Sequence, residues 1–262
     1  MKKMKIRAAM VFVTAVIAVF LIPASAQDAA TIKALQAAKA ELRAGINDWE
    51  TEHLLKARDM FIGCLLKLDK PNPYFYYYAA LADYRLGSYY LSAEAAADAD
   101  RFVSEGEDFI GKALDADPEF GEASSLYGFL LGIEVALHQE RAVSLGFKSL
   151  SLINVGIDKD PSNPRTHLMK GMYLLYVPEA FGGGPDNSVP SLEKALSLFE
   201  PKVASDPIKP SWGKDECLAY LGECWHQKGD LAKAREYFKK ALDLNPELYY
   251  ARYLLDEINK KF

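Results

Sequence analysis

A short pattern of small and large apolar residues recurs along this chain, and it constrains the fold more than any other feature. In the clearest copy Ala234, Phe238 and Ala241 follow one another at helical spacing, and Pro246 comes after them. Small residues let two helices approach closely, the large one fills the space between them, and proline cannot continue a helix. The other copies are Ala57, Phe61, Cys64 and Pro71; Gly106, Ile110, Ala113 and Pro118; Ser149, Ile153, Gly156 and Pro161; Ser188, Leu192, Ala195 and Pro201. The pattern predicts a series of helical hairpins.

The rest of the sequence is consistent with an all-α fold. Alternating β-branched runs are nearly absent, and Ala, Leu, Glu and Lys recur at helical spacing. We expect hairpins at 28–70, 73–117, 119–160, 164–201 and 215–245, a capping helix at 247–262, and an irregular proline-containing connection at 201–214. Because each hairpin buries its apolar face only against its neighbours, residues 27–262 should form one domain.

The segment 215–246 resembles the tetratricopeptide repeat (TPR), whose pattern is W-x2-L-G-x2-Y, then A-x3-F-x2-A, then proline. Leu218, Leu221, Gly222 and Trp225 occupy the first-helix positions, with Leu and Trp replacing the family's Trp and Tyr. Successive terminal prolines lie 40 to 47 residues apart, whereas the usual TPR period is about 34 and HEAT-type repeats share the longer one. The small-x3-apolar-x2-small spacing favours a TPR-type helical-hairpin solenoid with a C-terminal capping helix.

The first 26 residues have the three parts of a secretory signal peptide. Four basic residues precede an apolar run from Ala8 to Ile22, and Ala24, Ser25 and Ala26 form a small-x-small cleavage pattern before Gln27. The run is shorter than the roughly 20 apolar residues of a membrane span. We therefore expect cleavage between Ala26 and Gln27, a periplasmic or secreted product, and no stable membrane span after cleavage. Export, lengthened repeats and a glycine-rich loop at 181–185 are similar to exported bacterial TPR proteins, among them the T-component of TRAP transporters.

The net charge limits the classes of partner, and the spacing of the cysteines limits disulfide and metal binding. The net charge of −5 becomes −9 when the four basic and no acidic residues of the leader are removed, which argues against nucleic-acid binding. Cys217 and Cys224 lie seven residues apart on one expected helix, roughly 10 Å at about 1.5 Å per residue, too far for a disulfide. We expect buried free thiols rather than a metal site with His226.

No motif in the sequence indicates catalysis. The four histidines fall in separate hairpins, and neither a zinc-protease helix nor a nucleophile elbow is present. The glycine-rich loop continues into Pro185 and Asp186 instead of the lysine of a phosphate-binding loop. We expect it to be a flexible joint between the two helices of the fourth hairpin, with Asp186 or Asn187 as the cap of the second helix. We therefore expect a non-enzymatic protein without a cofactor or a metal.

The TPR resemblance implies a concave groove lined by the first helix of each hairpin, which family members typically use to bind a peptide or a partner helix. Alignment on the last repeat places Glu216, Glu223 and His226 in that groove. The other groove residues would be Tyr74, Tyr77, Leu81, Tyr84, Arg85, Phe129, Arg165, Met172 and Tyr176. Some eukaryotic members bind the terminal carboxylate of a chaperone peptide with lysine and asparagine at two inner positions. Here those positions hold Tyr77 and Leu81, so we do not expect this chain to bind chaperone tails.

Two interpretations of the aromatic run 74–78 stay open at this point. The rings fill long interfaces between helices, or they form an aromatic binding wall in which tyrosine supplies both area and a hydroxyl. Three functions follow: a scaffold that binds a protein or peptide in its groove, a small-molecule-binding accessory of a TRAP-like transporter with a pocket near Phe129, Met172 and Tyr176, or a structural subunit of a homo-oligomer.

Overall fold

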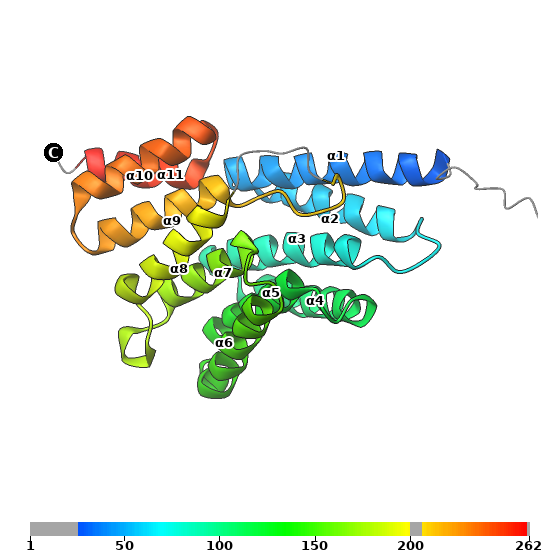
Figure 1. Cartoon of the computed structure of the whole chain (residues 1–262), viewed down its shortest axis with the longest axis horizontal. Helices are drawn as coiled ribbons and strands as arrows, with labels where there is room; N and C mark the ends of the chain where they lie inside the picture. Colours follow the sequence, from blue (N-terminus) through cyan, green and yellow to red (C-terminus); the bar gives the residue numbers. More distant parts are fainter. Residues whose placement is uncertain (1–25, 200–205, 261–262) are drawn as a thin grey trace, which may run out of the picture.

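The protein is described by a computed structural model over residues 26–199 and 206–260. Within these ranges the chain is all-helical and contains no strand, which confirms the expected fold class (Figure 1). The leader, its cleavage pattern up to Ser25, and Pro201 lie outside the described residues. The helices are α1 (Ala26–Asp48), α2 (Thr51–Leu65), α3 (Pro73–Ser92), α4 (Ala96–Ala116), α5 (Gly121–Leu137), α6 (Ala142–Lys159), α7 (Pro164–Tyr176), α8 (Pro185–Leu198), α9 (Lys214–Gln227), α10 (Leu231–Leu244) and α11 (Tyr249–Asn259), with short 3₁₀ turns at Gln139–Arg141 and Glu179–Phe181.

The helices form two layers. Each helix packs against the next one along the chain, and the odd-numbered helices α1, α3, α5, α7, α9 and α11 also contact one another in succession. The odd-numbered helices therefore make an inner layer, and the even-numbered helices cover it from outside. This arrangement is a helical repeat solenoid, in which each hairpin buries its apolar side against its neighbours.

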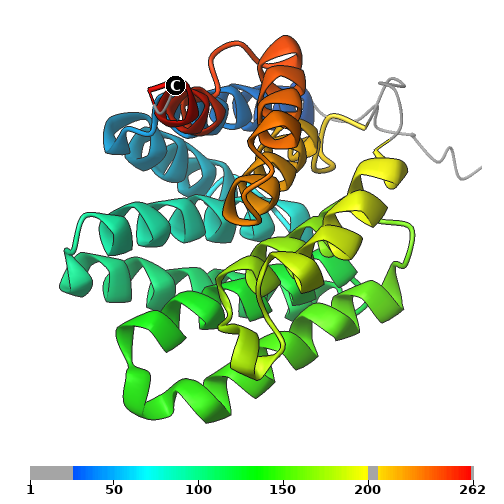
Figure 2. The same ribbon diagram turned by 90° about the vertical axis from the view of Figure 1, so that its left-hand side faces the viewer.

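The inner layer closes on itself, because α1 also contacts α11 (Figure 2). A polar cluster joins the two ends of the chain. Arg43 of α1 forms an ion pair with Asp215 at the start of α9. Asn245, which follows α10, donates to Asp215 at 2.7 Å and to Asn47 of α1 at 2.9 Å. Asn47 in turn donates to Glu247 at 3.2 Å. The first and last hairpins are thus neighbours although about 200 residues separate them.

Helix starts follow local signals in the sequence. Asn72 and Asn163 each precede a proline in the first helical turn, and each side-chain oxygen accepts a hydrogen bond from the backbone two residues on. Asp230 caps α10 by accepting from the N–H of Lys233, three residues on, and it directly follows Gly229, whose φ is +81°. Asparagine or aspartate satisfies an unpaired helix N–H, and proline at the first position loses no hydrogen bond. These caps fix where α3, α7 and α10 begin.

Close approach between paired helices depends on glycine and serine. A Cβ on Gly128 of α5 would lie 2.5 Å from the backbone oxygen of Ser149 in α6. The Ser149 hydroxyl donates to the carbonyl of Gly128 at 2.6 Å, so it is buried yet hydrogen-bonded. The small residues of the repeat pattern are therefore points of backbone contact between helices.

The glycine-rich loop differs from the flexible joint that its composition suggests. Gly184 donates its N–H to the carbonyl of Leu174 at 2.8 Å, and a Cβ on Gly183 would overlap the backbone of Val177. Neither Asp186 nor Asn187 caps α8, which begins at Pro185 after Gly184. The glycines permit a tight turn packed onto the end of α7, with φ values of +82° at Gly182 and +89° at Gly184.

The three cysteines are buried free thiols, as expected from their spacing. Over residues 26–199 and 206–260, no helix is both long and apolar enough to cross a membrane.

Glycine substitutions test the close helix approach. We expect Gly128→Ala to lower the free energy of unfolding by about 1–3 kcal/mol, because the added methyl group meets backbone that cannot move aside. Gly111→Ala is the matched control: it lies within α4 with nothing within 4 Å of the added carbon, and it should raise stability by up to about 1 kcal/mol. Urea unfolding followed by circular dichroism measures both changes. Equal effects of the two substitutions would contradict the packing described here.

Candidate functional site

The inner face contains a buried carboxylate that joins three first helices. Glu122 of α5 is 1% exposed. It accepts hydrogen bonds from the hydroxyl of Tyr77 (α3) at 2.5 Å and from Asn163 at 2.9 Å, and its oxygen lies 2.8 Å from Nε of Arg165 (α7). A buried charge is tolerated when it is paired and hydrogen-bonded. This cluster forms the floor of the inner face.

Residues 206–213, between α8 and α9, lie against this floor (Figure 1). Lys209 donates its N–H to the carbonyl of Asp206 at 3.1 Å, which makes a β-turn, and Trp212 follows without helical structure. The indole Nε1 of Trp212 donates to the hydroxyl of Tyr77 at 3.1 Å, and Tyr78 donates to the carbonyl of Lys209 at 3.1 Å. The chain's own connection therefore covers the residues that the sequence placed in an open groove.

A second buried ion pair lies beside Trp212. Nη2 of Arg85 (α3) is 2.6 Å from Oε2 of Glu216 (α9), and both side chains are about 5% exposed or less. The Arg85 guanidinium also stacks over the rings of Tyr84, at 5.1 Å, and Trp212, at 5.3 Å. Arg85 Nε and Glu216 Oε1 have no hydrogen-bond partner. Arginine suits this position because it pairs with a carboxylate and stacks on aromatic faces at once.

The inner layer is open at one rim, around Tyr176. This residue ends α7 and is 59% exposed. Its hydroxyl lies 3.1 Å from Glu223 of α9 and 3.2 Å from the hydroxyl of Tyr250 of α11. Tyr250 also donates to Glu223, and its ring packs on Tyr220 at 5.3 Å. We call Tyr176, Tyr220, Glu223 and Tyr250 the tyrosine rim.

The surroundings of the tyrosine rim shift the pKa values of its members. Burial raises the pKa of Glu223, and the hydroxyls of Tyr250 and Tyr176 oppose this by donating to the carboxylate. The pKa of Tyr176 is also raised above its usual range: its hydroxyl end is desolvated beside Glu223 and Tyr250, although the side chain as a whole is 59% exposed, and the charge of Glu223 reinforces the shift. The hydroxyls therefore stay protonated near neutral pH, and the rim offers neutral aromatic surface beside one carboxylate.

The structure places the residues expected in the groove on the inner layer but buries most of them. Tyr74 and Arg165 are half-buried, with Tyr74 packed edge-on to Phe120 at 4.9 Å, and Tyr176 alone is well exposed. The buried residues are Tyr77, Leu81, Tyr84, Arg85, Phe129 and Met172. The expectation that these six offer a free surface was wrong, because all six are buried, and Trp212 contacts Tyr77 and Arg85 directly. Binding by the nine residues together stays a prediction.

The aromatic run divides between the two interpretations. Phe75, Tyr77 and Tyr78 are 2% exposed or less and fill the interior, whereas Tyr74 and Tyr76 are half-buried. Phe61 stacks on Tyr78 at 5.3 Å. The aromatic run 74–78 therefore contributes mainly to the hydrophobic core.

Three residues of the inner face were missed by sequence reasoning. Trp212 lies in the connection between hairpins, which repeat alignment does not cover. Tyr250 lies on the capping helix, and Tyr220 is offset by one position from the aligned groove residues. The sequence signal that could have indicated Trp212 was an aromatic residue directly before a glycine. In the structure that glycine, Gly213, precedes α9 with a φ of +106°. Glu216 and Glu223 lie on the inner layer, while His226 is half-buried in the last turn of α9.

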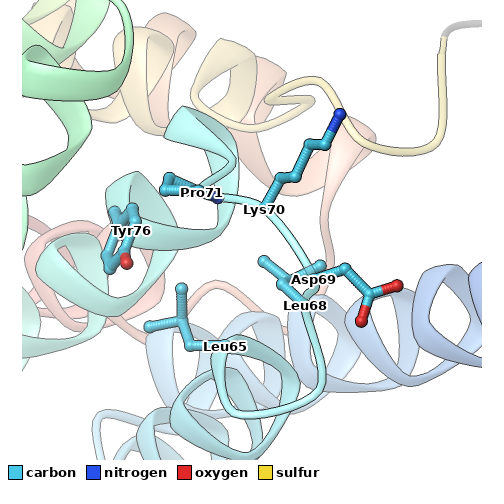
Figure 3. Close-up of a pocket in the computed structure, with 6 residues that line it drawn as sticks. All are labelled: Leu65, Leu68, Asp69, Lys70, Pro71 and Tyr76. Atoms are coloured by element: carbon cyan, nitrogen blue, oxygen red, sulfur yellow. The ribbon is translucent and has the colours of Figure 1, made fainter.

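Two shallow hollows lie away from the tyrosine rim. One is lined by the α2–α3 connection, where Lys70 extends toward the segment that precedes α9 (Figure 3). The other lies between the start of α4 and His138. Neither includes Phe129, Met172 or Tyr176, where a small-molecule pocket was expected. Among the residues that the structure describes, no three His, Cys, Asp or Glu side chains are grouped to hold a metal ion.

The comparisons with known proteins agree with this architecture. Residues 215–248 match the family model of the tetratricopeptide repeat. Among solved structures, the HusA haemophore from Porphyromonas gingivalis superposes with a TM-score of 0.63 at 21% identity, over 78% of this chain and 96% of its own. A thermophilic TPR protein of Thermus thermophilus, TTC0263, superposes with a TM-score of 0.57 at 19% identity, over 84% and 98%. No curated protein sequence matches the chain.

The fold is a TPR-type solenoid. The family match covers the last repeat, and the structural likeness extends the same architecture over the preceding hairpins.

The pKa of Glu223 gives a test of the tyrosine rim. The pKa of Glu223 is higher in the folded protein than in the unfolded chain. Between pH ~4.3, the usual glutamate pKa, and the folded pKa, the native state therefore binds more protons than the unfolded state does. The free energy of unfolding should therefore fall as pH rises through that window. Glu223→Gln should remove this slope. Urea unfolding of both proteins between pH 4 and 7 measures it, and parallel curves would contradict the buried setting of Glu223.

Proposed function

We propose that this TPR-type solenoid is an exported, non-enzymatic scaffold that binds a segment of a partner protein through the tyrosine rim of its inner face. The observation that carries the proposal is the exposure of Tyr176, because six of the other eight residues expected in the groove are buried. Tyrosine supplies rigid apolar area and a polar hydroxyl at low entropic cost, and it is enriched at binding hot spots.

The geometry of the rim supports protein binding. Its side chains come from α7, α9 and α11, so two repeats and the capping helix contribute to one surface. Hydrogen bonds to Glu223 hold Tyr176 and Tyr250 in place before any partner arrives. Preorganised side chains lose little freedom on binding, which favours affinity.

Export is the part of this proposal that rests on the sequence alone. The basic start, the apolar run and the small-x-small pattern before Gln27 support cleavage after Ala26 and a periplasmic or secreted location. Helix α1 begins at Ala26, so the expected cleavage leaves α1 attached to the rest of the array. The charge of the mature chain, −9, supports a partner other than nucleic acid.

The test is affinity capture from an envelope extract with residues 27–262, comparing Tyr176→Ala with a matched control. Tyr253→Ala is the control, because Tyr253 lies on α11, is 48% exposed and packs on Tyr249 rather than on the rim. We expect a partner that the parent and Tyr253→Ala capture equally and that Tyr176→Ala captures at least tenfold less. Equal capture by all three proteins would contradict binding at the rim.

Haem, the molecule to which the description of HusA as a haemophore refers, serves as the small-molecule probe in the same experiment. An absorbance titration of the mature protein with haem, repeated with Tyr176→Ala, separates the two kinds of ligand. The proposal predicts no saturable change that depends on Tyr176. A saturable change lost in Tyr176→Ala would replace a protein partner with a small molecule at the same surface.

A further inference from the structure

We infer that residues 206–212 are a built-in occupant of a peptide site on the inner face, and that a partner segment of the same chemistry competes with them for it. The inference rests on the proposed function, and it names both the chemistry of the partner and the element that regulates access. The partner segment would contain an Asp-Pro turn followed within a few residues by an exposed tryptophan.

The site holds the backbone of the segment through side chains from other helices. Lys39 of α1 donates from Nζ to the carbonyls of Pro207, at 3.0 Å, and Lys209, at 2.8 Å. Tyr78 of α3 donates to the same Lys209 carbonyl at 3.1 Å. Carbonyl oxygens are common to every polypeptide, so these donors are able to hold another segment that presents the same turn.

The turn itself comes from the sequence of the segment. The side chain of Asp206 accepts from the N–H of Ile208 at 3.0 Å, its carbonyl accepts from Lys209, and Pro207 occupies the second position. Aspartate at the first position and proline at the second favour this turn. The turn of the segment is therefore formed by hydrogen bonds within the segment itself.

Trp212 is the side-chain anchor of the occupant. Its indole donates to Tyr77, its ring lies 5.3 Å from the Arg85 guanidinium, and it is half-buried against the core. An indole that is partly desolvated and placed over an arginine is a typical binding hot spot. The site thus recognises a turn and an indole spaced a few residues apart, through the side chains of Lys39, Tyr77, Tyr78 and Arg85.

The helices on either side of the segment also pack directly on other helices. Helices α8 and α9 contact one another directly, as do α7 and α9. Asp206, Pro207, Lys209 and Ser211 are exposed, whereas Pro210 is buried and Ile208 and Trp212 pack against the core. The segment therefore lies at the surface of the inner face and is anchored there by three of its residues. Replacement of the segment by another chain is therefore sterically feasible.

Covalent attachment gives the internal segment an advantage over any free competitor. A tethered ligand has an effective concentration in the millimolar range for a short linker. An external segment should consequently bind the wild-type protein weakly, and binding should strengthen when the internal anchor is removed.

The probe is a fluorescein-labelled synthetic peptide with the sequence of residues 206–213, followed by fluorescence anisotropy. The receptors are the wild type, Trp212→Ala, and a variant in which residues 207–212 are replaced by a glycine–serine linker of equal length. The control peptide carries alanine in place of the tryptophan. Lys39→Ala in the Trp212→Ala background removes the backbone donor on the receptor, and circular dichroism establishes that each receptor is folded.

We expect the peptide to bind both segment variants at least tenfold more tightly than the wild type, and the control peptide or the added Lys39→Ala to weaken this binding at least fivefold. Equal binding to all receptors would overturn the inference, because the peptide would then bind elsewhere. Absence of binding to the folded variants would show that the segment is a structural tether. Unfolding of both segment variants would likewise overturn it, since the segment would then be part of the core. In all three cases the rim test with Tyr176→Ala still decides the proposed function separately.

Discussion

The contact between the two ends of the array governs the rest of this structure. Asp215 at the start of α9 is nearly buried, and its carboxylate is held by Arg43 of α1 and by Asn245. A desolvated carboxylate is costly unless it is paired and hydrogen-bonded, so Asp215 favours the arrangement in which α1 reaches the last repeat. With α1 beside α11, the five first helices and the capping helix α11 enclose their own inner face, and side chains that would line a groove become interior. The inner face accordingly has the chemistry of a polar core, with Glu122 paired to Arg165 and Arg85 paired to Glu216.

This closure determines which surfaces remain for a partner. An open solenoid presents the whole concave side of its first helices, whereas here the tyrosine rim is exposed and the adjoining floor is covered by residues 206–213. Arg85 links the rim and the floor, since it stacks on Tyr84 and Trp212 and interacts electrostatically with Tyr220 of the rim. A partner that binds at Tyr176 is therefore close to the segment that we infer to be a competitor. In this account, the surface that binds the partner adjoins the site where the internal segment restricts access.

Much of the fold follows from local sequence signals. The small-x3-large-x2-small pattern marks backbone contact between helices, and asparagine before proline marks where helices begin, so an all-α TPR-type solenoid could be predicted from the chain alone. The fourth hairpin, expected at 164–201, has α7 at Pro164–Tyr176 and α8 at Pro185–Leu198. The positions of Tyr77 and Arg85 on the inner layer also followed from alignment with the last repeat.

The burial of those residues could not be predicted in the same way. Closure depends on the accumulated rotation of five hairpins, which no single repeat encodes, and on contacts such as Asn47 with Asn245 between residues about 200 positions apart. Trp212 escaped prediction because a connection outside the repeats carries no periodicity. Glycine in the loop at 182–184 suggested flexibility, but the packing of that loop onto α7 is a tertiary contact that composition does not show.

Amide hydrogen exchange of the mature protein and of Asp215→Asn tests the closure most directly. Asp186→Asn is the control, because Asp186 forms an exposed ion pair with Lys228. The account predicts that Asp215→Asn lowers protection at the C-terminal end of α1 and in α11 together, although the two helices lie far apart in the sequence, and that the control changes neither. Loss of protection confined to α9 and α10, with α1 unchanged, would contradict a closed inner layer.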